Sequence, residues 1–121
     1  MVIDLEYMAG LVPVILRYVP LTLGMAIISM AIALVLAAAL AIVRVLRVPV
    51  ADRIVAVYIS FFRGTPLLVQ LFLFYYGLPQ LLPAARSIDG VTAAVIGLTL
   101  HFSAYMAESI RGAILGIDRS Q

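Results

Sequence analysis

The 121-residue chain is 65% apolar and only 12% charged, whereas soluble domains are about half apolar and about a quarter charged. A soluble fold of this length has no interior large enough for so much apolar surface, so a membrane must bury it. The chain has no cysteine and a single histidine, which excludes disulfides and argues against a metal site. Its net charge of +2 comes from arginines spread along the chain, so nothing supports nucleic-acid binding.

Residues 1–19 do not have the pattern of a secretory signal peptide. Asp4 and Glu6 stand where a signal peptide carries positive charge, and Pro13 and Pro20 interrupt the apolar run. We interpret this segment as an amphipathic lead-in that lies at the membrane interface. The alternative is a merely flexible terminus, because chain ends are often poorly ordered.

The first predicted membrane span covers residues 20–43, within a stretch that has no charged side chain between Arg17 and Arg44. At about 1.5 Å per residue, such a helix crosses a hydrocarbon layer of about 30 Å. Small residues recur along it at spacings of three and four, which predicts close packing against a neighbouring helix. This small-residue stripe consists of Thr22, Ala26, Ser29, Ala33 and Ala37.

The second predicted span covers residues 64–83. Thr65 followed by Pro66 predicts an N-cap and a first helical position, with Arg63 at the membrane interface. From Pro66, however, such a helix is only about 20 Å long where it meets Pro79. Either Pro79 is tolerated as a kink or the helix begins earlier, in the run VAVYISFF. The sequence leaves both possibilities open.

The third predicted span covers residues 90–112 and is polar for a helix that faces lipid. At 100° per residue, one narrow face carries Gly97, His101, Tyr105, Glu108 and Gly112. The opposite face carries Thr92, Thr99 and Ser103. Because ionisable groups at membrane depth seldom face lipid, we expect the first face to look into protein or a water-filled path. We expect lipid to contact Leu98, Leu100 or Met106 instead.

The arginines predict the orientation of the chain. Six of them are expected on one side, in the connection between spans one and two and after span three: Arg44, Arg47, Arg53, Arg63, Arg111 and Arg119. Only Arg17 and Arg86 fall on the other side. The positive-inside rule therefore places the N-terminus outside and Gln121 in the cytoplasm.

No catalytic site is evident. Glu108 and His101 lie about 10 Å apart along one helix, without a nucleophile or metal-binding set. The run RGTP lacks the Lys-Ser/Thr ending of a phosphate-binding Walker loop. We therefore expect that the chain is not an enzyme. The Glu108 carboxylate can instead form an ion pair, with Arg111 at i,i+3 or with Arg63 across helices.

Two runs of the chain resemble the permease subunits of bacterial polar amino-acid ABC importers. They are YISFFRGTPLLVQLFLFYYGLP, from Tyr58 to Pro79, and LTLHFSAYMAESIRGAILGIDRSQ, from Leu98 to Gln121. The resemblance covers the chain from Met8 onward. It implies an all-α integral membrane helical bundle with the type I ABC importer permease fold. Residues 1–121 would then be a partial transmembrane permease domain, the first three of about five helices.

This resemblance also implies partners and a place in the cell. The family's permeases work as homo- or heterodimers in the lipid of the bacterial plasma (inner) membrane, with ATP-binding cassette subunits and an extracytoplasmic amino-acid-binding protein. The chain itself would hold no cofactor, since the partner subunit uses the ATP. Its matches to the family motifs are Arg63, Gly64, Thr65, Pro66, Arg111 and Gly112.

The candidates for lining the substrate path are His101, Tyr105, Glu108 and Gln70. Each has a structural alternative. His101 and Gln70 can make hydrogen bonds between helices, and Glu108 can form an ion pair that sets the position of its helix. Under the functional reading, Glu108 would belong to a gate or coupling element near the inner face of the membrane.

The chain departs from the family pattern in two places. Ser120 stands where the family usually has a Gly, which is followed by Gln or His and then by the Glu-Ala-Ala coupling loop. The sequence stops at Gln121, before that loop, so we expect the ATPase contact to be absent from this chain. Many relatives carry Asn where His101 stands, which leaves the identity of the amino acid open. A small ion-coupled multidrug antiporter is one alternative, but its first helix would need a carboxylate. A non-transporting membrane scaffold is another, and it gives no reason for RGTP.

Overall fold

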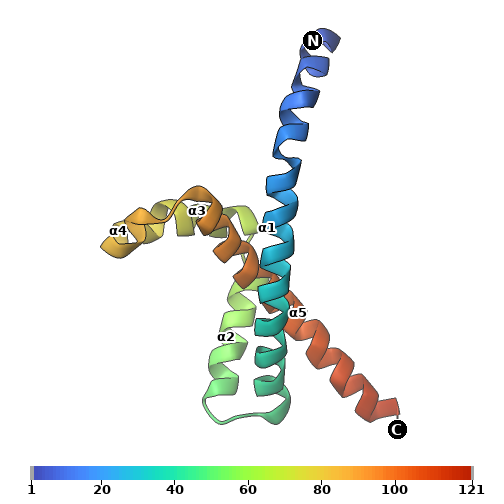
Figure 1. Ribbon diagram of the computed structural model, residues 1–121. Coiled ribbons are helices and arrows are strands. Elements are labelled where there is room, and N and C mark those ends of the chain that lie inside the picture. Colours follow the sequence, from blue (N-terminus) through green and yellow to red (C-terminus); the bar gives the residue numbers. More distant parts are fainter. Residues whose placement is uncertain (1, 121) are drawn as a thin grey trace.

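The computed structural model describes the backbone of residues 2–120 and the side chains of residues 2–117, and its elements are all helical. Figure 1 shows them in order: α1 (Leu5–Leu46), α2 (Ala51–Gly64), α3 (Leu67–Phe72), a π-helical turn (Leu73–Gly77), α4 (Leu78–Leu81), a 3₁₀ turn (Pro83–Ser87) and α5 (Gly90–Ser120). The predicted all-α membrane fold is confirmed. The predicted cytoplasmic position of Gln121 lies outside the described residues.

Two of these helices, α1 and α5, are long and apolar enough to cross a membrane. A third span is possible if α2 and the following helical segment Leu67–Leu81 act as one, although the two are bent by 108°. We call this segment, Leu67–Leu81, the arm. Of the three predicted spans, the first and third are therefore single helices, and the second is a broken one.

Helix α1 is continuous through both of its prolines. It begins after Asp4, whose carboxylate Oδ1 accepts the Tyr7 N–H at 3.0 Å, and it runs without a break past Pro13 and Pro20. No boundary near residue 20 separates a lead-in from a span. Prolines are tolerated within long apolar helices of this kind. At about 1.5 Å per residue, α1 is about 63 Å long, roughly twice the hydrocarbon layer. An interfacial position for its first turns stays a prediction.

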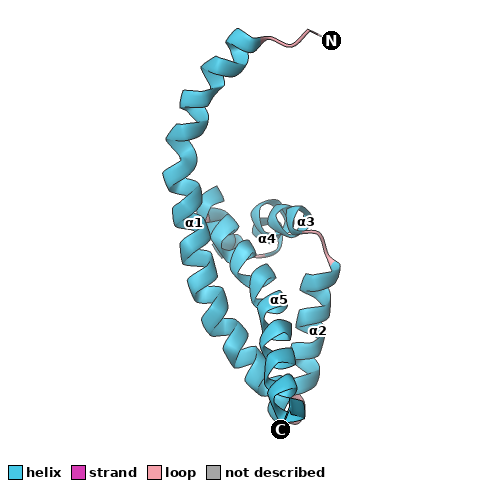
Figure 2. Ribbon diagram, turned by 90° about the vertical axis from the view of Figure 1, so that its right-hand side faces the viewer, coloured by secondary structure: helices cyan, strands magenta, loops and turns pink. Residues whose placement is uncertain are grey.

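The small-residue stripe of α1 packs where the prediction placed it, but over a shorter and shifted stretch. Ser29, Ala33 and Ala37 are buried to 1% exposure or less, and Ala41 extends the buried face by one turn. Thr22 and Ala26, in contrast, are exposed. The main partner of α1 is α5, which crosses it in the lower half of Figure 1. Figure 2 shows the N-terminal half of α1 extending away from the other helices.

The second predicted span bends sharply at residues 64–67, and we call this bend, together with the side chains that pack around it, the elbow. Thr65 and Pro66 are both extended there, with ψ of 134° and 140°. The helical region is disfavoured for a residue that precedes proline, and here α2 ends at Gly64, before Thr65. The predicted N-cap is therefore wrong: the Thr65 hydroxyl donates backward to the Phe61 carbonyl at 2.7 Å, and α3 begins only at Leu67. The helix does begin earlier, at Ala51, as the alternative allowed.

The arm tolerates Pro79 by widening the preceding turn. The turn Leu73–Gly77 is π-helical, and Pro79 lies in the first turn of α4. The arm ends where Leu82 becomes extended ahead of Pro83, the conformation that a residue before proline prefers. A 3₁₀ turn then leads to Asp89, which caps α5.

The core lies where α1, α2 and α5 meet, and it consists of Ala37, Val55, Ile59, Phe62, Ala104 and Ala107. Leu100 and Met106 pack against this core. Both side chains are only partly buried, so their contact with lipid stays a prediction. They are covered in part because α5 has neighbours on several sides, with α1, α2 and the arm all in contact with it. Leu98 is also only partly exposed.

Arg63 lies at the opposite end of α2 from the turn at residues 47–50. Arg44, Arg47 and Arg53 gather at that turn, where Arg44 forms an ion pair with Asp52 at 3.2 Å. Arg63 is about 18 Å further along α2 by the standard helical rise. The prediction placed Arg63 on the same side of the membrane as the other three arginines. That grouping does not hold, because helix α2 and not a loop separates Arg63 from them.

Candidate functional site at the elbow

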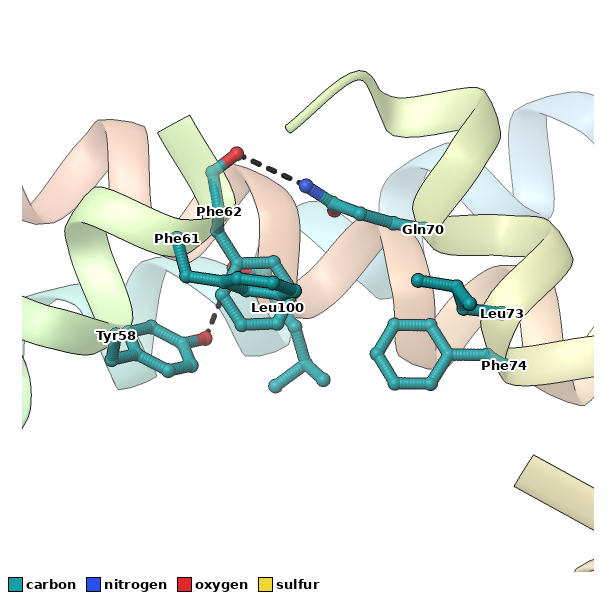
Figure 3. Close-up of a pocket in the computed structure, with 7 residues that line it drawn as sticks. All are labelled: Tyr58, Phe61, Phe62, Gln70, Leu73, Phe74 and Leu100. Atoms are coloured by element: carbon teal, nitrogen blue, oxygen red, sulfur yellow. Dashed lines mark hydrogen bonds between the residues drawn. The ribbon is translucent and has the colours of Figure 1, made fainter. Parts of the chain in front are cut away.

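Gln70 is the central polar side chain of the elbow. It is 1% exposed, and its amide nitrogen donates to two backbone carbonyls on the α2 side, Phe62 at 3.1 Å and Thr65 at 2.9 Å. Figure 3 shows this side chain reaching from the arm to Phe62. Its amide oxygen lies 3.1 Å from Nδ1 of His101 on α5. One buried amide therefore connects three helical segments.

The Phe62 carbonyl needs this donor because of the proline in the chain. In a continuous helix it would accept the N–H of the residue four positions later, but that residue is Pro66, which has no N–H. Buried backbone carbonyls are costly without a partner, and the cost rises to several kcal/mol in hydrocarbon. The Gln70 amide supplies the missing hydrogen bond, which explains how the chain can break a helix here.

The same hydrogen bonds define the tautomer of His101. Because the Gln70 nitrogen faces two carbonyls, its oxygen must be the atom that faces the imidazole. That oxygen can only accept, so Nδ1 of His101 carries the proton and donates it. His101 is 8% exposed and packs against the Tyr105 ring, with 5.0 Å between ring centres. Both predicted path candidates, Gln70 and His101, thus have hydrogen-bonding roles between helices.

A second polar contact, not singled out from the sequence, connects α2 to α5. The Tyr58 hydroxyl lies 3.0 Å from the Leu100 carbonyl and 2.8 Å from Oγ of Ser103, which is itself 2.8 Å from the same carbonyl. Ser103 is fully buried. The signal for Tyr58 was present in the sequence, since it is the only side chain with a ring hydroxyl in the apolar run before the elbow.

The elbow borders a half-open cavity of about 270 Å³ lined by Tyr58, Phe61, Phe62, Gln70, Leu73, Phe74 and Leu100. These side chains come from α2, the arm and α5, and Figure 3 shows how they surround it. Phe61 is half-exposed at its edge, whereas Phe62 is buried and stacks on Phe74. Nearly all of the wall is aromatic or aliphatic, so the cavity suits an apolar group rather than a charged one.

Arg63 and Tyr105 meet on the outer side of the elbow. The Tyr105 hydroxyl donates to the Arg63 carbonyl at 3.1 Å, and the guanidinium lies 5.6 Å from the centre of the Tyr105 ring. A cation at this distance is attracted by the face of an aromatic ring. The adjacent Gly64 has open space around its Cα. These motif residues therefore contribute to the end of α2, but they do not line the cavity.

Glu108 and Arg111 form the predicted i,i+3 ion pair. Two nitrogens of Arg111 bind the two carboxylate oxygens at 3.3 and 2.9 Å. This confirms Arg111, rather than Arg63, as the partner of Glu108. Gly112, on the next turn, is exposed with open space beside it.

The predicted polar face of α5 is buried in its N-terminal part and exposed further along the helix. Gly97 and His101 are buried, whereas Tyr105 and Gly112 are exposed. At Gly97 the arm approaches so closely that an added Cβ would lie 2.5 Å from a methyl carbon of Leu71. The N-terminal half of α5 therefore packs on the arm, and the remaining part of that face continues towards the end of the helix beyond the elbow.

The fold and the elbow define a helical membrane protein whose second apolar segment is broken. No family model matches the chain. A probable amino-acid ABC transporter permease protein, PatM of Vibrio harveyi, is 59% identical over 118 residues, which are 98% of this chain and 53% of that protein. The probable amino-acid permease protein YxeN of Bacillus subtilis (strain 168) is 45% identical over 119 residues, again 98% and 53%.

A solved structure agrees with these relatives. A crystal structure of an amino acid ABC transporter with histidines superposes with a TM-score of 0.82 at 31% identity, covering 99% of this chain and 55% of the other. Along nearly all of its length, this chain is therefore homologous to the amino-acid ABC transporter permeases. It spans about half the length of the curated relatives that it matches.

Proposed function

We propose that this chain is part of the permease subunit of an ABC importer, which moves a polar amino acid into the cytoplasm. The observation that carries the proposal is the 59% identity to a probable amino-acid ABC transporter permease over 98% of the chain. The TM-score of 0.82 to a solved amino acid ABC transporter supports it independently.

The proposed importer needs partners that couple it to energy and substrate. ATP is hydrolysed by an ATP-binding cassette subunit, an extracytoplasmic binding protein delivers the amino acid, and a second permease subunit completes the path. The proposed site is the bacterial inner membrane, with the N-terminus outside. In support of this orientation, the turn at residues 47–50 and the C-terminal end of α5 lie at the same end of the molecule, away from the N-terminus (Figure 1).

The elbow supplies the features that such a path requires. A permease must hold a zwitterion weakly enough to release it, so fixed dipoles are better suited than full charges at membrane depth. His101, with Nδ1 donating to Gln70, keeps Nε2 for a second hydrogen bond. Tyr105, one turn further along α5, adds an exposed aromatic ring. In this proposal His101 and Tyr105 border the path, while Gln70 holds His101 in place through the hydrogen bond between them.

Uptake in proteoliposomes tests this function. The complete permease would be reconstituted with its ATP-binding cassette subunit, with ATP on the side of that subunit, and supplied with the binding protein and radiolabelled polar amino acids. We expect accumulation that needs ATP and the binding protein, and none without the cassette subunit. Uptake by the permease alone, driven by a proton gradient, would point to an ion-coupled antiporter. A stable complex that transports no amino acid would favour a scaffold.

A further inference from the structure

The geometry of the elbow gives Gln70 a position that few side chains could occupy. Its own backbone N–H donates to the Pro66 carbonyl at 3.2 Å, so Gln70 belongs to the first turn of α3. From there the side chain reaches back across the break to the end of α2. The amide thus joins the two sides of the break, and it lies within the protein at 1% exposure.

The elbow has a limited set of donors for its open carbonyls. The Thr65 hydroxyl already donates to Phe61, and Pro66 has no N–H. Phe62 and Thr65 are left to the two hydrogens of the Gln70 amide. Because the amide plane is rigid, both bonds can form only over a narrow range of angles between α2 and α3. The bend of 108° is therefore coupled to the position of one side chain.

The third bond of Gln70 extends this constraint to α5. Its amide oxygen accepts from His101, and the close contact of Gly97 with Leu71 brings the arm against the same helix. An arm that rotated about the elbow would have to break the bond to His101 or move α5 with it. The cavity would change shape as well, since its wall comes from all three elements.

We propose that Gln70 is a positioning residue that sets the angle between α2 and the arm and, through His101, the position of the arm on α5. It acts on transport without contacting the amino acid. The effect on transport rests on the proposed function, whereas the effect on the elbow angle does not. In lipid the constraint is strong, because water cannot replace a lost partner of the Phe62 carbonyl.

A distance measurement tests the structural part directly. This chain has no cysteine, and any cysteine in the rest of the permease would first be replaced by serine. Spin labels can then be attached through Val57→Cys on α2 and Leu81→Cys at the end of the arm, which are 70% and 80% exposed. In the complete permease in lipid nanodiscs, we expect one narrow distance distribution. Gln70→Met, which has a similar size but no donor, should broaden and shift it. Gln80→Met is the matched control at an exposed position of the arm and should leave it unchanged.

A double-mutant cycle covers the case in which Gln70→Met fails to fold. Pro66→Ala restores an N–H four residues after Phe62, so the α2 ladder can satisfy that carbonyl by itself. We expect Gln70→Met alone to reduce the amount of folded permease about tenfold. Adding Pro66→Ala should recover a large part of that loss. If the loss of folded permease in the double variant equals the product of the losses in Gln70→Met and Pro66→Ala, Gln70 contributes packing and not the missing hydrogen bond. That result would overturn the proposal.

Variants of His101 test the position of the arm on α5 separately from the angle between α2 and the arm. His101→Asn places an N–H close to that of Nδ1 and should keep the distance distribution of the parent, whereas His101→Leu should broaden it. In the uptake assay, Gln70→Met, which lacks the donors, should lower the maximal rate per folded permease about tenfold with little change in the half-saturating concentration. An unchanged distance distribution in both Gln70→Met and His101→Leu would contradict the proposal, even if the permease transports no amino acid.

Discussion

The N-terminal half of α1 and the elbow differ in how their prolines affect the helix. Residues 2–23 are all exposed, and their helix runs unbroken past two prolines with a largely apolar surface. The elbow breaks its helix at one proline and satisfies the open carbonyls with a buried amide. The first region depends on hydrophobic length. The second depends on a few specific atoms.

This difference indicates where the sequence of a membrane protein carries specific information. Lipid offers no hydrogen bonds, so an unbroken helix needs little beyond apolar side chains, whereas a broken one needs a dedicated donor for each open carbonyl. Small residues form a third case, as on the buried side of α1. Their role is to let α5 approach, which makes them sensitive to size and indifferent to polarity. Each class predicts its own response to mutation.

The largest effect is expected at the crossing of α1 and α5. Ala37 has no exposed surface and belongs to the core, so Ala37→Leu forces extra atoms into a packed contact and should destabilise it by about 1–3 kcal/mol or more. The measurement is the yield and the thermal unfolding of the complete permease in detergent. Ala39→Leu, on the exposed side of the same helix, is the matched control. Equal losses in both variants would show that this crossing does not hold the helices together.

The next largest effect is expected at Tyr58, whose hydroxyl connects α2 to α5. Tyr58→Phe keeps the ring but removes the hydroxyl that contacts Leu100 and Ser103, and interhelical hydrogen bonds in membranes average about 0.6 kcal/mol, with a maximum of about 1.7. We expect a loss of that size in thermal unfolding. Ser103→Ala should not add fully to it, because both hydroxyls belong to one network. Tyr76→Phe, at an exposed position, should have no effect.

A smaller change in stability, with a change in transport, is expected at Glu108. Its ion pair with Arg111 is worth about 0.2–0.5 kcal/mol, as for other helical i,i+3 pairs. If Glu108 serves as a gate or coupling element in the proposed importer, Glu108→Gln lowers the uptake rate by more than this small loss explains. Ser109→Ala is a suitable control because Ser109 is exposed, whereas Ser103 is buried and hydrogen-bonded. Normal uptake by assembled Glu108→Gln permease would assign the carboxylate a structural role only.

The smallest effect is expected at the start of α5. Hydrogen bonds from the side chain and the backbone N–H of Thr92 hold the pKa of the Asp89 carboxyl below its ordinary value of 3.8. A lowered pKa means that the cap stabilises the helix above pH 3.8 and loses this contribution as the pH falls through the folded-state pKa. Amide exchange at Thr92 should then become faster relative to a peptide reference. In Asp89→Asn, which caps without titrating, this acceleration should be absent.

The parts of the fold that depend on local spacing could be predicted from the sequence. The start of α5 at Gly90, the buried Ser29, Ala33 and Ala37, and the pairing of Glu108 with Arg111 all follow from residues within a few turns of one another. Charge-free length likewise predicted the two long helices. Such features need no knowledge of which segments meet.

The elbow could be predicted only in part, because it depends on contacts between segments. That Phe62 loses its helical donor at Pro66 can be read from the spacing of four residues. Nothing local shows that the replacement comes from Gln70 rather than from another helix, or that His101, 31 residues further on, binds the same amide. The prediction for Thr65 failed for the same reason. Its hydroxyl can donate back to a carbonyl of α2 or accept a free N–H from the first turn of α3, and the tertiary bend decides between the two.

The most direct test of this account is a density map of the complete permease in lipid nanodiscs. We expect α2 to end at the elbow, with the Gln70 amide nitrogen close to the distances found here, 3.1 Å from the Phe62 carbonyl and 2.9 Å from that of Thr65. An unbroken helix through Thr65 and Pro66, or a Gln70 side chain turned towards lipid, would contradict the claim that a buried amide replaces the hydrogen bond removed by the proline.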